Sequence, residues 1–315
     1  MDISFLICTY NAPELIKRCL NSILKQDYKG SKEIILVDGG SNSETLEVLK
    51  EYKSKNKNIR IIKNKKRLPE GYGKGKWLGW RNCKGKFVFI IDQDNEIRDK
   101  NCVKEMLKPF KDDVFGCLCP TYVKEKDSLT NKYIALMGTD PVFAYRSVDG
   151  IRNLKKIGED KKDYTIITIN KDNLIITGGN CFIYRKDWLD EVGGYTQDTE
   201  NIARLVGSGH NKAAISKKAS THHLAIRGFL DFVKKKKKWA KTYEKNSGFS
   251  YSPLNKEEKH KWIVNLFFIF SVLPTLAISL RQFIKTREKA WLLHPILSWI
   301  TGFIYFWYTF LRLKM

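Results

Sequence analysis

The stretch Phe87-Val88-Phe89-Ile90-Ile91-Asp92-Gln93-Asp94-Asn95 decides the fold of this chain. Five apolar residues in a row are typical of a strand buried in a parallel sheet, and the run ends at two carboxylates. In an extended chain, residues two apart point to the same side, so Asp92 and Asp94 can converge on one cation. Mg²⁺ suits such a pair, because it takes one or two protein carboxylates and completes its octahedron with water and phosphate oxygens. An isolated Asp-x-Asp is more often a solvated turn, and the surrounding motifs distinguish the two interpretations.

The composition points to an anionic partner. The 315 residues carry a formal net charge of +23, and 43% of them are hydrophobic, which is ample for a core. Such a charge favours nucleic acid, a phosphorylated substrate or an acidic membrane surface. The seven cysteines show no metal-ligand spacing. Their odd number, with several inside apolar runs, indicates a reducing compartment without a disulfide framework.

Strands and helices alternate along the N-terminal half. Apolar runs at 3–8, 33–38 and 59–62 predict strands, and capping residues followed by helical apolar patterns come after the first two. A glycine-rich turn over 71–76 then opens a short helix before the strand that ends at Asp92. This alternation predicts an α/β fold with a doubly wound, mostly parallel sheet. A nucleotide would bind at the carboxyl ends of its strands.

Three motifs, in this order, resemble glycosyltransferase family 2. They are Phe5-Leu6-Ile7-Cys8-Thr9-Tyr10-Asn11, Ile35-Leu36-Val37-Asp38-Gly39-Gly40-Ser41 and Ile91-Asp92-Gln93-Asp94-Asn95. The resemblance covers roughly residues 1–225 and implies an inverting, nucleotide-sugar-dependent enzyme with the Rossmann-like GT-A fold.

The resemblance also implies site residues. Asp92 and Asp94 would form a motif that binds Mg²⁺ or Mn²⁺, with Asp92 facing the nucleotide as well. The remaining residues of the nucleotide pocket would be Thr9, Tyr10, Asn11 and Asp38. Many members carry a second acidic residue after the one that corresponds to Asp38. Here Gly39 stands in that place, which leaves open whether the nucleotide is UDP or GDP.

Two lysines lie close to the expected diphosphate. Lys74 and Lys76 stand near a glycine-rich helix start, where they can add a positive contact to the diphosphate. They are two of 57 basic residues, so the alternative is that both are solvated surface lysines.

A second group of motifs resembles the acceptor side of the same family. It comprises a glycine turn, a Tyr-Arg-Lys segment, a Gly-Gly-Tyr turn and Gln197-Asp198 at the start of a helix. The resemblance implies that Asp198 is the general base, whereas a lone Asp at this spot would otherwise be a helix cap. The residues that it places on the acceptor side are Gly178, Gly179, Asn180 and Arg204.

Adjacent histidines follow at His222 and His223. In an extended chain they face opposite ways, so at most one readily joins the metal or pyrophosphate site. We assign His222 to the metal, although the sequence does not distinguish it from His223, and a packed histidine is the alternative.

The C-terminal part has a different character. A basic amphipathic helix region is expected over 226–261, and apolar segments at 262–280 and 291–311 contain no Asp, Glu, Lys or Arg. A membrane span needs about 20 residues, so two membrane helices are expected in a hairpin over 262–315. The alternatives are a shallow position at the membrane interface, or a helical hairpin buried in a core or an oligomer contact.

The sequence therefore predicts a GT-A domain (1–225), a basic juxtamembrane helix (226–261) and a membrane hairpin (262–315). We expect transfer of a sugar from a UDP- or GDP-linked donor to a polyprenyl-phosphate or lipid-linked glycan. An exopolysaccharide or cell-surface glycan is the alternative acceptor. The catalytic domain is expected on the cytoplasmic face of a membrane, with an anionic membrane surface as partner and no nucleic acid. A membrane-anchored nucleic-acid-binding protein and a catalytically inactive scaffold are alternatives from other classes.

Overall fold

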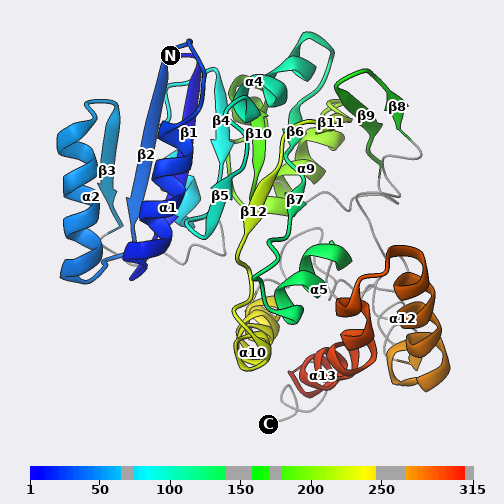
Figure 1. Ribbon diagram of the computed structural model, residues 1–315. Helices are drawn as coiled ribbons and strands as arrows, with labels where there is room; N and C mark the ends of the chain where they lie inside the picture. Colours follow the sequence, from blue (N-terminus) through cyan, green and yellow to red (C-terminus); the bar gives the residue numbers. More distant parts are fainter. Residues whose placement is uncertain (65–73, 139–157, 171–178, 246–266, 309–315) are drawn as a thin grey trace. The chain divides into compact units, whose positions relative to one another are not determined.

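A computed structural model describes residues 1–64, 74–138, 158–170, 179–245 and 267–308 (Figure 1). The chain divides into two compact units. The first unit comprises Met1–Tyr122 with Leu154–His223, and the second comprises Val123–Asn153 with Leu224–Met315. The segment 123–153, which lies inside the first predicted domain, thus groups with the C-terminal part of the chain.

A nine-stranded sheet in the order β3-β2-β1-β4-β10-β6-β11-β9-β8 forms the centre of the first unit (Figure 1). Its strands are β1 Ile3–Thr9, β2 Lys32–Asp38, β3 Ile59–Lys63, β4 Phe87–Ile90, β6 Gly116–Leu118, β8 Glu159–Asp160, β9 Tyr164–Thr168, β10 Phe182–Arg185 and β11 Lys212–Ser216. A second sheet in the order β5-β12-β7 consists of β5 Asn95–Ile97, β7 Thr121–Tyr122 and β12 Thr221–His223.

The large sheet is parallel in one half and mixed in the other. β1 pairs in parallel with β2 and β4, and β2 pairs in parallel with β3. β10 runs antiparallel to both β4 and β6, and β9 runs antiparallel to β11. The predicted α/β sheet is confirmed, but it is mixed rather than mostly parallel. An apolar run reveals a buried strand without revealing the direction of the strands beside it.

Helices cover both faces of the parallel half. Ile16 and Leu20 of α1 pack into the same core as Phe5 and Ile7 of β1. α3 packs on the opposite face, where a β-carbon at Gly79 would lie 2.1 Å from Leu6 Cδ1. The helices of this unit are α1 Pro13–Leu24, α2 Ser43–Lys55, α3 Lys74–Trp80, α4 Cys102–Leu107, the 3₁₀ helix η2 Lys108–Lys111, α8 Lys186–Glu191 and α9 Asp198–Gly207.

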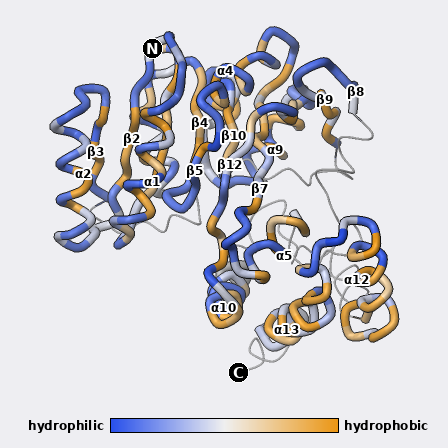
Figure 2. The backbone as a smooth tube through the Cα atoms, viewed as in Figure 1, coloured by the Kyte–Doolittle hydropathy of each residue, from blue (hydrophilic) through white to orange (hydrophobic). Residues whose placement is uncertain are grey.

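The second unit is helical. It contains α5 Leu129–Met137, α10 Phe229–Lys245, α12 Val272–Thr286, the 3₁₀ helix η5 Lys289–Leu293 and α13 His294–Phe306. α10 confirms a helix in the basic region as far as Lys245. Figure 2 shows apolar residues along much of α12 and α13, in agreement with the two apolar segments of the sequence.

The prediction of two membrane helices is wrong. Within the described ranges, the chain has no helix that is long and apolar enough to cross a membrane. α12 has 15 residues and α13 has 13, so they are about 22 and 20 Å long, against about 30 Å for a bilayer core. α12 starts only after Ser271, and α13 starts at His294, after the separate 3₁₀ helix η5. The apolar segments are therefore divided by helix ends that composition does not reveal.

Candidate active site

The expected nucleotide pocket begins where β1 ends. Thr9 is buried, and its Oγ1 donates a hydrogen bond to Gln93 Oε1 at 2.7 Å. The backbone N–H of Tyr10 donates to the same oxygen at 3.1 Å, while the Tyr10 side chain is exposed. The middle residue of the Asp-x-Asp motif therefore connects the end of β1 to the turn after β4 that carries the two aspartates. Sequence analysis had given Gln93 no role.

The loop after β2 is ordered by Asp38 and Asn11. Asp38 accepts hydrogen bonds from the backbone N–H groups of Gly40 (3.2 Å) and Ser41 (3.1 Å). Asn11 adopts a left-handed conformation (φ 45°) and its Oδ1 accepts from Asn42 N–H at 2.8 Å. Asn11 thus connects the ends of β1 and β2, and it does not cap α1, whose N-cap is Ala12.

The Asp-x-Asp pair follows β4 directly. Val88 to Ile91 are fully buried, which confirms the expected strand. Asn95 Nδ2 donates to Asp94 Oδ1 at 3.2 Å. Asn180 Oδ1 accepts from Asp92 N–H and from Asn95 Nδ2, both at 3.0 Å. Asn180, predicted on the acceptor side, therefore holds the backbone of the aspartate motif in place.

Lys76 lies between the aspartate motif and the acceptor side. Its Nζ is 3.0 Å from Asp92 Oδ1 and donates to the carbonyl oxygen of Gly179. Burial opposes the positive charge of Lys76, but the carboxylates of Asp92 and Asp198 outweigh it and raise its pKa. Burial also raises the pKa of Asp92. The charges of Asp94 and Asp198 raise it further, and the positive charge of Lys76 opposes them.

Asp198 is the first residue of α9, and the N-cap of this helix is Gln197. Its carboxylate accepts a hydrogen bond from the hydroxyl of Tyr195. Burial and the Asp198 charge raise the pKa of Tyr195, so this hydroxyl stays protonated and donates. The geometry therefore does not support a helix cap at Asp198, and it adds Tyr195, which the Gly-Gly-Tyr turn had indicated only as a motif.

Arg204 holds the turn before α9. Its guanidinium donates to the carbonyl oxygens of Val192 and Gly194 and, at 2.9 Å, to Thr196 Oγ1. These contacts fix the Gly-Gly-Tyr turn and, through it, the start of the helix that carries Asp198. Of the other predicted residues, Gly178 and the side chain of Lys74 lie outside the described residues.

The two histidines occupy different surroundings. His223 Nε2 lies 3.4 Å from Asp94 Oδ1. The ring of His222 is buried beside Tyr122, and its Nδ1 lies 3.4 Å from Arg18 Nη2. The geometry thus places His223 next to the aspartate motif, and the assignment of His222 to the metal stays a prediction.

A family model of glycosyl transferase family 2 matches residues 4–193, more than half of the chain. The chain belongs to this family.

Curated relatives match only in part. An uncharacterised glycosyltransferase of Methanocaldococcus jannaschii is 34% identical over 104 residues, which cover 33% of this chain and 35% of the relative. The poly(ribitol-phosphate) beta-N-acetylglucosaminyltransferase TarS of Staphylococcus aureus is 32% identical over 109 residues, covering 34% of this chain and 18% of TarS.

Solved structures support the GT-A fold. The mannosyltransferase PcManGT of Pyrobaculum calidifontis, in complex with GDP-Man and Mn²⁺, has a TM-score of 0.59 and 14% identity over 98% of this chain and 87% of that chain. TarS residues 1–349 in complex with UDP-GlcNAc has a TM-score of 0.54 and 19% identity over 100% of this chain and 92% of that chain. At these identities the likeness concerns the fold alone.

The residues of this family 2 glycosyltransferase fit a divalent cation that is shared with a ligand. In the part of the chain that the structure describes, three or more potential ligands do not converge on one point. Asp92, Asp94 and His223 nevertheless offer two carboxylates and an imidazole. Burial raises the pKa of Asp92, and the charges of Asp94 and Asp198, which a cation would help to neutralise, raise it further. Mg²⁺ commonly binds through one or two carboxylates plus phosphate oxygens, so an incomplete protein site agrees with a metal that arrives with a diphosphate.

Proposed function

We propose that this glycosyltransferase moves a sugar, with inversion, from a UDP- or GDP-linked donor to an acceptor at a membrane surface. The observation that carries the proposal is the chain of contacts from Asp92 through Lys76 to Gly179 and Asp198. It joins the aspartate motif of the donor side to the carboxylate of the acceptor side. Inverting transfer needs these two kinds of group on opposite faces of one sugar.

The reaction would be one displacement at the anomeric carbon. A hydroxyl oxygen of the acceptor forms the new glycosidic bond as the bond to the nucleoside diphosphate breaks, and Asp198 takes the hydroxyl proton. Tyr195 holds the Asp198 carboxylate by its hydrogen bond. Asp92, Asp94 and His223 would hold a Mg²⁺ or Mn²⁺ ion, which supplies charge neutralisation to the leaving diphosphate. Lys76 supplies a fixed positive charge beside Asp92.

The nucleotide and the acceptor are proposed from the residues of the pocket and from the relatives. Thr9, Tyr10, Asn11 and Asp38 would line the nucleotide pocket with Asp92. Structural neighbours were solved with GDP-Man and with UDP-GlcNAc, so both nucleotides stay in the proposal. A relative from Methanococcus voltae that is 38% identical over 92 residues is a dolichyl N-acetyl-alpha-D-glucosaminyl phosphate glycosyltransferase, and TarS acts on poly(ribitol-phosphate). We propose a lipid-linked acceptor, with a cell-surface glycan as the second candidate.

The second unit supports a membrane surface as partner. In α12 the polar Thr275, Ser279 and Gln282 are buried, whereas several leucines and isoleucines of the same helix are exposed. In α13, His294, Ser298 and Thr301 are likewise buried. The exposed apolar side chains of the two helices and of η5 between them are Val272, Leu273, Leu276, Leu280, Ile284, Leu292, Ile296, Phe303 and Phe306.

Exposed apolar side chains beside buried polar ones favour an apolar environment, such as lipid, at the exposed face of these helices. Basic residues lie at the same helices and their connection, namely Arg281, Lys285, Arg287 and Lys289. We therefore propose that this face rests at the headgroup level of an anionic leaflet without crossing it. The donor would be drawn from the cytoplasmic side, where nucleotide sugars are made, and the seven cysteines, all free and buried, agree with a reducing compartment.

The donor is tested by screening UDP- and GDP-linked sugars for thermal stabilisation of the full chain, with Mn²⁺ and with EDTA. One nucleotide sugar should stabilise the chain in a metal-dependent way, because a ligand that binds the folded state shifts unfolding by mass action. The double variant Asp92→Asn and Asp94→Asn should keep its fold and lose the metal-dependent shift. A shift of wild-type size in this variant would show that the aspartate pair does not hold the metal and diphosphate.

The membrane partner is tested with two leucines of matched exposure. Leu280 of α12 is 52% exposed and Leu129 of α5 is 49% exposed. The full chain should sediment with vesicles that contain phosphatidylglycerol, less so in high salt because exposed charges are screened. Leu280→Asp should weaken this binding by about tenfold, since a charge at the interface is costly, whereas Leu129→Asp should not. Equal binding of both variants, or no binding by wild type, would overturn the membrane proposal.

A further inference from the structure

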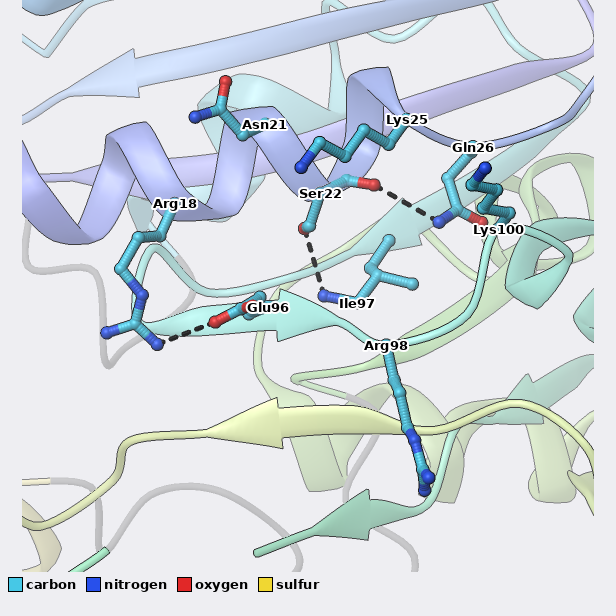
Figure 3. A pocket seen from close by; sticks show the side chains of 9 residues that line it. All are labelled: Arg18, Asn21, Ser22, Lys25, Gln26, Glu96, Ile97, Arg98 and Lys100. Atoms are coloured by element: carbon cyan, nitrogen blue, oxygen red, sulfur yellow. Dashed lines mark hydrogen bonds and ion pairs between the residues drawn. The ribbon is translucent and has the colours of Figure 1, made fainter. Parts of the chain in front are cut away.

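A pocket of about 330 Å³ lies in the first unit between α1 and the segment that begins with β5 (Figure 3). Arg18, Asn21 and Ser22 come from the second half of α1, and Lys25 and Gln26 follow its C-terminal end. The opposite wall is residues 96–98, together with Lys100. None of Asp92, Asp94 and Asp198 lines this pocket, so it is separate from the candidate active site.

The floor of the pocket is fixed by buried polar groups. Ser22 Oγ accepts from Ile97 N–H at 3.0 Å, which joins α1 to β5. Gln26 Nε2 donates to Ser22 O at 3.2 Å and to Asp99 O at 2.9 Å, and Gln26 Oε1 accepts from Val103 N–H at 3.2 Å. Hydrogen bonds therefore hold the two walls at a set distance.

The walls are strongly basic. Among the lining residues, four are positively charged (Arg18, Lys25, Arg98 and Lys100) and Glu96 alone is negative. Arg18 forms an ion pair with Glu96 at 2.8 Å, and the Arg98 guanidinium lies 5.0 Å from the centre of the Tyr122 ring. For Lys25 and Lys100, no ion pair is formed within the described ranges, and both side chains are exposed at the pocket.

We propose that this pocket binds a phosphoryl group that carries an organic substituent. The positive charges of Lys25, Lys100 and Arg18 line one pocket, where Glu96 is the one acidic lining residue, and an anion bound there would reduce the repulsion between them. Phosphate oxygens accept hydrogen bonds from ammonium and guanidinium groups, which are the donors at hand. The volume matches roughly ten water molecules, more than a bare phosphate fills. The extra space has the buried Ser22 hydroxyl and Gln26 amide at its floor.

The site is independent of the proposed donor chemistry. The wall formed by β5 begins at Glu96, two residues after Asp94, and continues to Lys100. An occupant of the pocket would therefore contact residues outside the aspartate motif. A phosphate ester in solution and a phosphodiester within a longer acceptor present the same chemistry to Lys25 and Lys100. The two sources differ in charge and in the number of substituents, which allows an experiment to separate them.

The test is calorimetric titration of the full chain, in EDTA and at constant ionic strength, with inorganic phosphate and with glycerophosphoglycerol as a phosphodiester probe. The variant Lys25→Gln with Lys100→Gln should bind the preferred probe about tenfold more weakly. The matched control is Lys50→Gln with Lys53→Gln, which removes the same charge from two exposed lysines of α2. Binding by this control and by the Asp92→Asn, Asp94→Asn variant should equal wild type, which separates the pocket from the donor site.

Tighter binding of glycerophosphoglycerol would identify a phosphodiester as the ligand, and tighter binding of inorganic phosphate would identify a phosphate monoester. A third variant, Glu96→Gln, removes the one negative charge of the lining and should strengthen binding. The proposal is overturned if neither probe binds at millimolar concentration. It is equally overturned if the two lysine pairs lose the same affinity, because the effect would then come from net charge alone.

Discussion

The carboxylate of Asp198 lies directly against the α-carbon of Gly179. A β-carbon at residue 179 would be 1.6 Å from Asp198 Oδ2 and 1.8 Å from its Cγ. Gly179 therefore does more than form a turn on the acceptor side: its missing side chain is the space that the Asp198 carboxylate occupies. The carbonyl oxygen of the same glycine accepts from Lys76, so one residue sets the positions of both charged side chains.

Gly179→Ala should displace the Asp198 carboxylate, because contacts this short do not occur in proteins. Turnover should fall by about 10²-fold, on the scale of a misplaced general base, while donor affinity changes little. Gly207→Ala is the control, since Gly207 lies in the same helix as Asp198 and a β-carbon there meets nothing within 4 Å. Steady-state kinetics with the donor identified by thermal screening measures both. Wild-type turnover in Gly179→Ala would show that the position of Asp198 is not critical.

The two adjacent histidines give a second prediction. His223→Gln should weaken Mn²⁺ binding in the presence of UDP or GDP by about tenfold or more, because the imidazole beside Asp94 is lost. His222→Gln should have a much smaller effect, since that ring lies next to Arg18 and Tyr122. Electron paramagnetic resonance of free Mn²⁺ measures both affinities without turnover. A larger loss in His222→Gln would restore the assignment made from the sequence.

Local patterns predicted the parts of the fold and site that depend on neighbours in sequence. The buried strand before Asp92 is such a feature, and the structure contains it. Properties set by distant residues were not predictable. The antiparallel direction of β10, the contact of Gly179 with Asp198, and the preference for His223 beside Asp94 all depend on chain segments that meet only after folding.

The prediction of membrane helices was wrong for a different reason. Counting apolar residues does not reveal where a helix ends. The structure divides the first segment at Ser271 and the second between Leu293 and His294. It also buries several polar side chains of these helices, such as Ser279 and Ser298, and exposes several apolar ones, such as Leu273 and Phe303. Lys76 shows the opposite case: the sequence offered it only as a possible contact to a diphosphate, and its burial between two carboxylates became visible in three dimensions.

His294 predicts a pH dependence for the second unit. It is fully buried, its Nδ1 is 2.7 Å from the Tyr133 hydroxyl, and burial lowers its pKa to about 4. In the unfolded chain the pKa of a histidine is about 6.5. Between these values the unfolded state binds more protons, so the free energy of unfolding rises with pH. As pH falls from 6.5 to 4, the unit should lose about 3 kcal/mol.

Hydrogen exchange over α13, corrected for the intrinsic pH dependence of exchange, measures this change. His294→Gln cannot take up the proton, so it should flatten the slope of protection between pH 4 and 6.5, even though it costs stability through the lost Tyr133 contact. His210→Gln, which removes a half-buried histidine of the first unit, should leave the slope over α13 unchanged. An unaltered slope in His294→Gln would assign the pH dependence to other groups.

Asp198 gives the prediction that bears most directly on mechanism. Asp198→Asn keeps the size of the side chain and an oxygen that can accept from Tyr195, so the local structure should persist. The amide cannot take a proton at neutral pH. With a hydroxyl acceptor, turnover should fall by about 10²-fold or more while donor affinity stays near wild type, because the base acts only on the acceptor. Tyr195→Phe, which removes the hydrogen bond but keeps the carboxylate, should cause a smaller loss.

A phosphate acceptor would change the outcome in a defined way. A phosphate oxygen is already ionised and needs no base, so Asp198 would then only position the acceptor. The Asp198→Asn variant should in that case lose less turnover and show a raised KM for the acceptor, since binding and not proton transfer would be impaired. Comparing kcat and KM for a hydroxyl and a phosphate acceptor therefore identifies the chemical class of the acceptor as well as the role of Asp198. Wild-type kcat and KM with both acceptors would exclude Asp198 from the reaction.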